Sequence, residues 1–293
     1  MHNLTGIKEV KGLLSRHGFT FSKAKGQNFI INPGVCPRMA TESGCEGIGV
    51  IEIGPGIGVL TVELARLARR VVCIELDTRL APILEETLNG LDNVSVVFED
   101  VLKVDLAALI AREFAGMEVV VCANLPYYIT SPIVMNLLES RLPVKAITVM
   151  VQKEAAQRLC AQPATRDVGA VSIAVRFYSE PKVLFQVSRG SFLPAPDVDS
   201  SVIRLAIHDA PPVAVREEKL FFAVVRAAFS QRRKTISNSL SGVGGLSKER
   251  VLSVLQLADV PANARAEQLT LAQFAAIADG VKTEQESERN VPL

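Results

Sequence analysis

Short apolar runs alternate with amphipathic stretches between residues 48 and 150 of the chain. The runs are rich in Val and Ile and are apolar on both faces, as strands buried in a parallel sheet are. They are residues 48–53, 71–76, 94–98, 118–123 and 146–151. Helix-like stretches lie between them, at residues 60–70, 78–88, 105–114 and 131–140. This order predicts an α/β fold in which helices cover a mostly parallel, Rossmann-like sheet.

The pattern changes after residue 152. Residues 152–160 read as a helix, residues 171–188 as two strands around a turn at Glu180 and Pro181, and residues 200–208 as a further strand. These strands could extend the sheet with antiparallel members. We therefore expect a first domain, residues 1–210, that has the Rossmann-like fold.

The rest of the chain is helical in pattern. Residues 208–215 contain two prolines and read as a linker. Helical patterns follow at residues 217–230, 233–240, 247–258 and 270–280. The polar end, residues 282–290, is expected to fray. We expect a small all-α domain over residues 211–293.

Composition limits the class of protein. The chain has 293 residues, 48% of them hydrophobic and 22% charged, which is ordinary for a folded protein. The chain contains no apolar stretch of about 18 residues, so no membrane span is expected. No signal sequence is recognisable either. Five cysteines without close pairs and three scattered histidines favour buried thiols in a reducing compartment and no metal site. We expect a cytoplasmic monomer that does not bind membranes.

Positive charge is clustered although the net charge is only +1. One cluster near the N-terminus includes Lys23 and Lys25, and a second includes Arg232, Arg233 and Lys234. Such clusters can form a face for an anionic ligand, but they are equally consistent with a solvated helix surface.

Glycines follow the first strand. Gly54, Gly56 and Gly58 lie between a strand and a helix, where the missing Cβ atoms allow a sharp turn and the close approach of a ligand. A dinucleotide fingerprint would require another glycine at the position of Val59. The pattern therefore suits a ligand without a pyrophosphate, although a plain tight turn would also explain it.

Acidic residues end the next two strands. Glu75 ends the second strand and can accept hydrogen bonds from ribose hydroxyls. Glu99 and Asp100 end the third strand, where an acid can face an adenine amine. Each acid alone could be a surface residue. Together with the glycines they predict a site for S-adenosylmethionine, since ligands of such sheets bind outside the carboxyl ends of the strands.

The fourth strand ends in Asn124, Leu125, Pro126 and Tyr127. The Asn124 side-chain oxygen and the Leu125 carbonyl can hold the hydrogens of an exocyclic amine. Pro126 fixes the backbone, and Tyr127 offers a face on which a flipped base stacks. The alternative is a turn residue followed by a packed aromatic ring. For Tyr128 packing is the preferred interpretation.

With these motifs the chain resembles the bacterial small-subunit ribosomal RNA adenine dimethyltransferases over nearly its whole length. The resemblance rests on KGQNFI (25–30), EIGPGIGVLT (52–61), IELD (74–77), EDVL (99–102), NLPYYIT (124–130), GAVSIAVRFYSE (169–180), FLPAPDVDSSV (192–202) and QRRKTISNSL (231–240). General methyltransferases lack the last two motifs. Ile30 and Tyr128 differ from the family's usual leucine and asparagine.

The resemblance implies roles for individual residues. Asn28 and Ile30 would cover the cofactor from an N-terminal arm, and Phe192 would stack on the target adenine from the face opposite Tyr127. Residues implied to contact the cofactor are Gly54, Gly56, Glu75, Asp100 and Asn124. Those implied to face rRNA phosphates are Lys23, Lys25, Arg232, Arg233 and Lys234. Without the resemblance, Phe192 reads only as an apolar residue of a loop.

The implied activity is dimethylation of two adjacent adenosines near the 3′ end of 16S rRNA, within the small-subunit precursor. A 23S rRNA or DNA adenine methyltransferase is the first alternative, against which the FLPAPDVDS stretch argues. The second alternative is an assembly factor whose binding matters more than its methylation. The order of the methyl transfers does not follow from the sequence.

Overall fold

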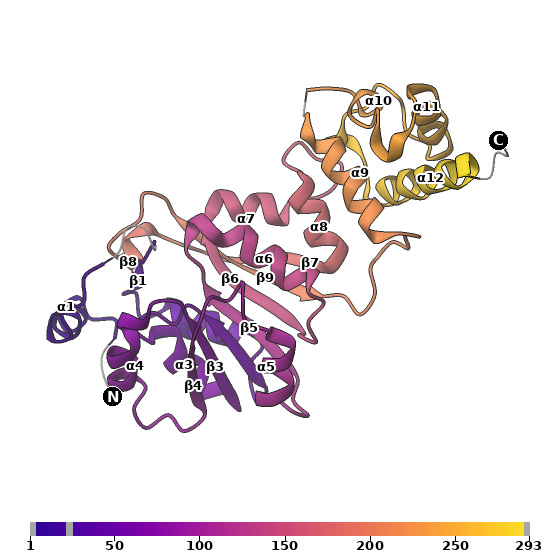
Figure 1. Ribbon diagram of the computed structural model, residues 1–293. Helices are drawn as coiled ribbons and strands as arrows, with labels where there is room; N and C mark the ends of the chain where they lie inside the picture. The colour runs from indigo at the N-terminus through magenta and orange to yellow at the C-terminus, as the bar shows by residue number, and fades with distance from the viewer. Residues whose placement is uncertain (1–3, 22–25, 232, 290–293) are drawn as a thin grey trace. The chain divides into compact units, whose positions relative to one another are not determined.

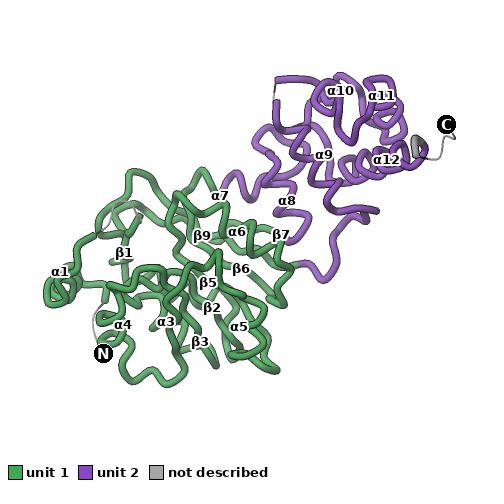
Figure 2. The backbone as a smooth tube through the Cα atoms, viewed as in Figure 1, with its two compact units in different colours: residues 1–156, 180–207 green, residues 157–179, 208–293 purple. Residues whose placement is uncertain are grey.

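The computed structural model describes residues 4–21, 26–231 and 233–289, and the chain divides into two compact units (Figure 2). Unit 1 comprises Met1–Ala156 and Glu180–Ile207, and unit 2 comprises Gln157–Ser179 and His208–Leu293. The chain changes unit at residue 208, close to the expected boundary at 210. Unlike the expected division, residues 157–179 group with the helical unit rather than with the sheet.

Unit 1 is built on a seven-stranded sheet with the strand order β4-β3-β2-β5-β6-β9-β7 (Figure 1). Its strands are β2 (Gly49–Ile53), β3 (Arg70–Glu75), β4 (Val94–Phe98), β5 (Val119–Asn124), β6 (Ala146–Gln152), β7 (Ser179–Val187) and β9 (Ser200–Ile207). The strands from β2 to β6 pair in parallel, and β9 runs antiparallel to β6. The strands expected from the apolar runs are therefore confirmed.

The strand order places a ligand site at one position. The chain starts at β2, moves outward through β3 and β4, and then returns to β5 on the other side of β2. In open α/β sheets the crevice at this switch, outside the carboxyl ends of the strands, is where ligands bind. The register brings these ends level, because Ile53 of β2 pairs with Ile74 of β3 and with Ala123 of β5.

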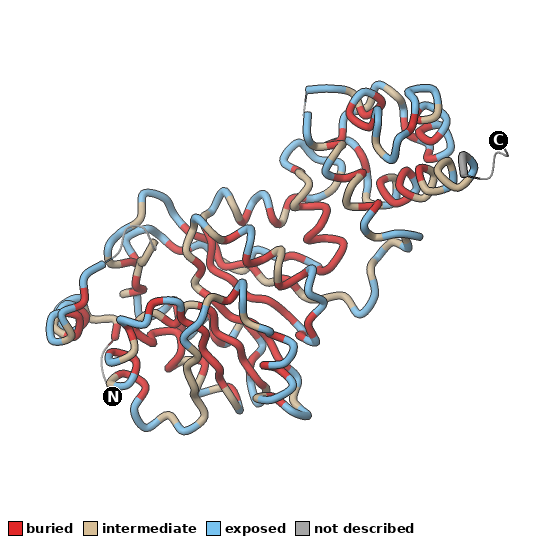
Figure 3. The backbone as a smooth tube through the Cα atoms, in the orientation of Figure 1, coloured by how far each residue is buried: buried red, intermediate tan, exposed pale blue. Residues whose placement is uncertain are grey.

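Helices connect the parallel strands, as the amphipathic stretches predict. They are α3 (Val59–Leu67), α4 (Ala81–Thr87), α5 (Leu106–Glu113) and α6 (Thr130–Glu139), with α2 (Val35–Ser43) preceding β2. The central strands β2, β3 and β5 are buried along all or nearly all of their length, whereas the edge strand β4 is only partly buried (Figure 3). Burial on both faces is the reason for their continuous apolar sequence.

A second, two-stranded sheet joins distant parts of unit 1. It pairs β1 (Phe29–Ile30) with β8 (Phe192–Leu193) in antiparallel register, so that Ile30 lies opposite Phe192. The helix α1 (Ile7–Arg16) precedes it in the chain. The pairing fixes the N-terminal segment beside a stretch more than 150 residues later in the sequence.

The structure corrects the expectation of two strands over residues 171–188. The first half is the helix α8 (Ala170–Tyr178), and only the second half is a strand, β7. Almost every side chain of α8 is buried, so the helix lacks the polar face that would have revealed its period. The Arg176 guanidinium donates hydrogen bonds to the carbonyls of Cys160 and Ala161, which ties α8 to the end of the preceding helix.

Unit 2 is helical. Besides α8 its elements are the second half of α7 (Lys153–Cys160), α9 (Glu218–Ser230), α10 (Ile236–Ser239), α11 (Lys248–Leu257) and α12 (Leu271–Arg289). Phe177 of α8 stacks on Phe221 of α9 with ring centroids 4.9 Å apart. This aromatic contact with α9 explains why residues 157–179 group with unit 2.

The C-terminal end corrects a second expectation. Residues 282–289 continue α12 instead of fraying. Lys282 forms an ion pair with Glu217 at 2.7 Å, and Arg216 forms one with Glu286 at 2.9 Å. These ion pairs hold the polar part of α12 against the start of α9, which the polar composition alone did not reveal.

Candidate active site

The glycine turn after β2 forms the floor of a cavity at the switch between β2 and β5. Gly54, Gly56 and Gly58 all have positive φ, at 71°, 59° and 88°, a region that residues with a Cβ rarely adopt. The Gly54 amide donates to the Ile74 carbonyl at 2.9 Å, which ties the turn to β3. A Cβ on Gly56 would lie 3.1 Å from the Phe29 ring. The turn therefore needs its glycines for conformation and for space.

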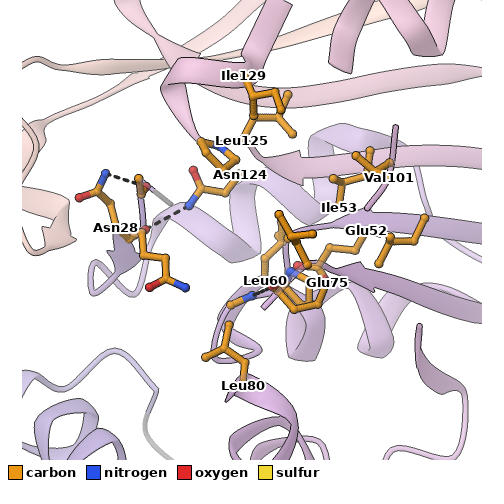
Figure 4. Close-up of a pocket in the computed structure, with 18 of the residues that line it drawn as sticks. Asn28, Glu52, Ile53, Leu60, Glu75, Leu80, Val101, Asn124, Leu125 and Ile129 are labelled. Carbon is orange, nitrogen blue, oxygen red and sulfur yellow. Dashed lines mark hydrogen bonds between the residues drawn. The ribbon is translucent and has the colours of Figure 1, made fainter. Parts of the chain in front are cut away.

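Glu75 faces this cavity from the end of β3 (Figure 4). Its carboxylate accepts hydrogen bonds from the backbone amides of Gly56, at 3.3 Å, and Asp77, at 2.8 Å. Burial raises the pKa of Glu75, and these two amide donors counteract that rise. The amides fix the carboxylate in the orientation in which its remaining lone pairs can accept hydroxyl groups of a ligand.

Carboxylates give this side of the cavity its charge. Four line it, and we call them the carboxylate wall: Glu52, Glu75, Glu99 and Asp100. Among the residues that the structure describes, no Lys, Arg or His lines the cavity. Such a wall favours a cationic ligand and disfavours a phosphate-bearing one. S-adenosylmethionine, with its sulfonium and amino groups, fits this charge, and a dinucleotide does not.

Glu52 was not singled out from the sequence. It lies next to the last residue of the buried strand β2 with 1% of its surface exposed, and the Cys73 thiol donates to it at 3.4 Å. Burial raises its pKa to about 7. A carboxyl group buried at a ligand cavity is a candidate partner for a ligand's positive charge.

Two apolar residues of the cavity were also missed. Leu76 is 54% exposed although it is apolar, and Val101 lies beside Asp100. Each directly follows an acid at a strand end, and the two can cover an aromatic ring whose polar edges the acids bind. The apolar residue after each acid was the available sequence signal.

The end of β5 forms the opposite side of the cavity, which we call the amide wall: Asn124, Leu125, Pro126 and Tyr127. The Asn124 amide nitrogen donates to the Asn28 carbonyl at 3.4 Å (Figure 4), and the Leu125 amide donates to the Met150 carbonyl at 3.2 Å. Within the described part of the chain, the Asn124 side-chain oxygen and the Leu125 carbonyl accept no hydrogen bond. Two acceptors thus remain for a ligand's amine.

Tyr127 is half-buried beside these acceptors. Its hydroxyl forms a 2.6 Å hydrogen bond with the Ser200 hydroxyl, at the start of β9. Burial raises the pKa of Tyr127, so the phenol is neutral. Ser200 is fully buried and was not recognised from the sequence. It belongs to the FLPAPDVDSSV motif, and the hydrogen bond shows how this motif contacts NLPYY.

A strap of residues 26–32 borders the cavity, and residues 26–30 of it line the cavity. Asn28 and Ile30 line the cavity, where the resemblance implied that they would lie. The strap is held at one end by Gln27, whose side chain donates to the Asp77 carboxylate at 2.8 Å, and at the other by the Ile31 amide, which donates to the Ser191 carbonyl at 2.8 Å. Gln27, like Ser200, was missed because its partner is distant in sequence.

Phe192, implied to stack on the target adenine, is a buried residue beside the strap. Its ring is 3% exposed and belongs to the hydrophobic core, and it does not line the cavity. The pairing of Ile30 with Phe192 in the two-stranded sheet accounts for this position. Phe192 therefore supports the strap, and its stacking on a base stays a prediction.

Tyr128 differs from the expectation of a packed ring. It lines the cavity and is 59% exposed.

Of the basic residues expected to face RNA, Arg233 and Lys234 are exposed in unit 2. Lys23, Lys25 and Arg232 lie outside the described residues.

The described residues lack two features of other classes of protein. They contain no group of three or more His, Cys, Asp or Glu side chains arranged to hold a metal ion. Nor do they contain a helix with the length and hydropathy needed to span a bilayer.

Comparison with known proteins agrees with the geometry. Residues 18–282 match the family model described as ribosomal RNA adenine dimethylase. The chain is 48% identical to ribosomal RNA small subunit methyltransferase A of Geobacillus thermodenitrificans, over 92% of this chain and 94% of that one. It is 42% identical to the protein of the same name from Clostridioides difficile, over 98% of this chain and 100% of that one.

Solved structures resemble the fold as well. A dimethyladenosine transferase from Plasmodium falciparum superposes with a TM-score of 0.72 and 26% identity, covering 85% of this chain and 95% of that one. The 23S rRNA methyltransferase ErmE superposes with a TM-score of 0.68 and 27% identity, covering 87% of this chain and 100% of that one.

Proposed function

Since the chain belongs to the ribosomal RNA adenine dimethylase family, we propose that it uses S-adenosylmethionine to dimethylate two adjacent adenosines near the 3′ end of 16S rRNA. The observation that carries the proposal is the pair of acceptors, the Asn124 side-chain oxygen and the Leu125 carbonyl, beside Tyr127 in a cavity with a carboxylate wall. Relatives named for the small subunit, at up to 48% identity among those compared, favour 16S rRNA over other substrates.

The amide wall would hold the adenine. An exocyclic amine is a weak nucleophile because its lone pair is delocalised into the ring. Acceptance of its two hydrogens by Asn124 and Leu125 favours a pyramidal nitrogen with its lone pair directed at the methyl donor. Tyr127 would stack on the base, and alignment of the reacting atoms would provide most of the rate enhancement. The proton of the alkylated amine can pass to water.

The carboxylate wall would hold the cofactor, which supplies an electrophilic methyl group when bound. Glu75 would accept hydrogen bonds from the ribose hydroxyls, and Asp100 would face the adenine amine. Gly54 and Gly56 would allow close approach of the ligand to the backbone. Asn28 and Ile30 of the strap would cover it.

Exposed cations would bind the RNA backbone. Arg233 and Lys234 of unit 2 are exposed, and we assign the same role to Lys23, Lys25 and Arg232. Contacts to phosphates add affinity that falls with salt but carry no sequence information. We further propose that the substrate is the precursor of the small subunit, that the protein acts in the cytoplasm, and that it is a monomer.

The direct test supplies a tritiated methyl donor with under-methylated 30S subunits and, separately, 50S subunits, and then maps the label. We expect label only on adenines near the 3′ end of 16S rRNA. The 50S arm is needed because the fold also resembles that of a 23S rRNA enzyme. Label on 23S rRNA, or on neither particle, would reject the proposal.

A first prediction concerns the amide wall. Asn124→Ala and Tyr127→Ala should abolish methyl transfer while the Kd for S-adenosylmethionine, measured by calorimetry, changes little. Asn89→Ala is the matched control, because Asn89 is exposed and does not line the cavity. Transfer at the wild-type rate by either cavity variant would reject the roles given to Asn124 and Tyr127. Co-sedimentation of Asn124→Ala with immature subunits would measure binding separately from methylation.

A further inference from the structure

Tyr128 stands apart from the other two tyrosines of the chain. The hydroxyl of Tyr127 is bonded to Ser200, and that of Tyr178 donates to Glu218. Tyr128 is 59% exposed and has no hydrogen-bond partner among the described residues. It is the most exposed aromatic side chain among the large apolar residues at the described surface. An exposed tyrosine ring at the edge of a ligand cavity presents a flat aromatic face to whatever binds there.

The ring nevertheless has a defined position. A Cβ built on Gly26 would lie 3.3 Å from the Tyr128 ring and 3.5 Å from the Pro126 side chain, so the ring rests against the strap. Gly26 has a φ of 58°, which favours glycine there and leaves room for the ring. Contact on one side and exposure on the other make Tyr128 an aromatic surface held in place at the rim of the cavity.

Tyr127 and Tyr128 cannot serve the same base. They are consecutive residues of a short 3-10 helix, Tyr127–Ile129, in which neighbouring side chains point about 120° apart. Tyr127 is anchored inward by Ser200, whereas Tyr128 lies at the rim against Gly26. If a flipped base occupies the site beside Tyr127, the next nucleotide of the same strand must pass the rim.

We propose that Tyr128 is a stacking platform for the nucleobase that adjoins the target adenosine in the RNA strand. The inference rests on the proposed function. Unpaired bases of RNA are held by stacking on exposed aromatic rings, which every base can do without sequence preference. The ligand of this subsite is therefore an unstacked nucleobase, and its binding covers the exposed face of the ring.

The test is a double-mutant cycle between the protein and the RNA. The proteins are wild type, Tyr128→Phe and Tyr128→Leu, with Phe98→Leu as the control for loss of an exposed ring that does not line the cavity. The RNAs are 30S particles reconstituted with 16S rRNA that has an abasic nucleotide on one side or the other of the target adenosine. The Kd of each pair is measured, together with the Kd for S-adenosylmethionine.

We expect Tyr128→Leu to weaken particle binding by roughly fivefold to a hundredfold, the range for loss of one stacked base, and Tyr128→Phe to bind like wild type. For one of the two abasic positions, particles that carry the abasic nucleotide should bind wild-type protein more weakly by a similar factor. The same particles should bind Tyr128→Leu no more weakly than normal particles do. The Kd for the cofactor and the binding by Phe98→Leu should be unchanged.

Three results would overturn the inference. The first is wild-type binding of the particle by Tyr128→Leu. The second is that the loss from Tyr128→Leu adds fully to the loss from the abasic nucleotide at both positions. The third is weaker cofactor binding by Tyr128→Leu with normal particle binding, which would make the ring a support of the strap instead. Methylation of normal 30S particles by the wild-type protein is measured alongside. Its absence would reject the proposed function, whereas its presence with an unaffected Tyr128→Leu would reject only the platform.

Discussion

The carboxylate wall and the amide wall of the cavity are constructed in different ways. Glu75 is oriented by the amides of Gly56 and Asp77, which are 19 and 2 residues away in the sequence. Asn124 and Tyr127 are oriented by partners 96 and 73 residues away, at Asn28 and Ser200. The first wall follows from the ends of successive strands. The second exists only where distant segments meet.

The two walls also differ in charge. The carboxylate wall contains four acids, one of which, Glu52, has its pKa raised to about 7 by burial. The amide wall is neutral, since burial raises the pKa of Tyr127 above its already high ordinary value. Changes of pH near neutrality should therefore act on the carboxylate wall and leave the amide wall unchanged.

The largest expected effect tests this difference through Glu52. Its pKa is raised from 4.5 to about 7 in the folded protein, so the folded state holds the proton more tightly than the unfolded state does. The stability from the neutral acid is complete below about pH 4.5 and is lost as the pH rises to about 7. Wild type should lose roughly 3 kcal/mol relative to Glu52→Gln across this window, as measured by urea unfolding.

The control for this experiment is Glu139→Gln, which changes an exposed carboxyl group. It should follow the wild-type pH profile, whereas Glu52→Gln should lack the decline. Parallel profiles for wild type and Glu52→Gln would show that burial of Glu52 does not set the pH dependence.

The next largest effect concerns cofactor affinity. Glu75→Gln places an amide nitrogen against the backbone donor of Gly56 or Asp77 and removes the charge that strengthens hydrogen bonds to ribose hydroxyls. We expect the Kd for S-adenosylmethionine to rise by about a hundredfold, the loss of roughly two charge-assisted hydrogen bonds.

The rate at saturating cofactor should change little in the same variant, because Glu75 does not touch the amide wall. Glu99→Gln is the matched control, since Glu99 lines the same wall but is exposed, and its effect should be far smaller. A loss in kcat with an unchanged Kd would contradict the separation of the two walls.

The difference between the walls also explains what could be predicted from the sequence. Gly54, Glu75 and Asp100 were predicted at one site because the ends of successive parallel strands meet there. Buried strands are recognised by continuous Val and Ile runs, and the parallel sheet follows from their alternation with helices. Residues 171–178 were predicted to be a strand because a helix buried on nearly all sides resembles a buried strand in composition.

Contacts between distant segments explain what was missed. Gln27 and Ser200 act through single side chains whose partners, Asp77 and Tyr127, have no sequence relation to them. The burial of Phe192 depends on the pairing of β1 with β8. Strands of only two residues are too short to leave a recognisable pattern in the sequence. The local sequence pattern thus predicts the carboxylate wall well. The orientation of the side chains in the amide wall could be learned only from the structure.

The smallest expected effect tests that orientation directly. Ser200→Ala removes the hydroxyl that holds Tyr127, at the cost of one hydrogen bond worth roughly 1 kcal/mol, or about a fivefold change. If this bond sets the tilt of the ring on which the base stacks, kcat for methylation should fall by about fivefold while the Kd for S-adenosylmethionine is unchanged. Tyr127→Phe should show the same loss for the same reason.

The double variant separates orientation from general packing. Ser200→Ala combined with Tyr127→Phe should be no worse than either single change, because both remove the same bond. Ser201→Ala, at the next and similarly buried serine of β9, should leave kcat unchanged. Additive losses, or an equal loss from Ser201→Ala, would mean that β9 supports the site only by packing. In that case the link between FLPAPDVDSSV and NLPYY would have no role in the orientation of the base.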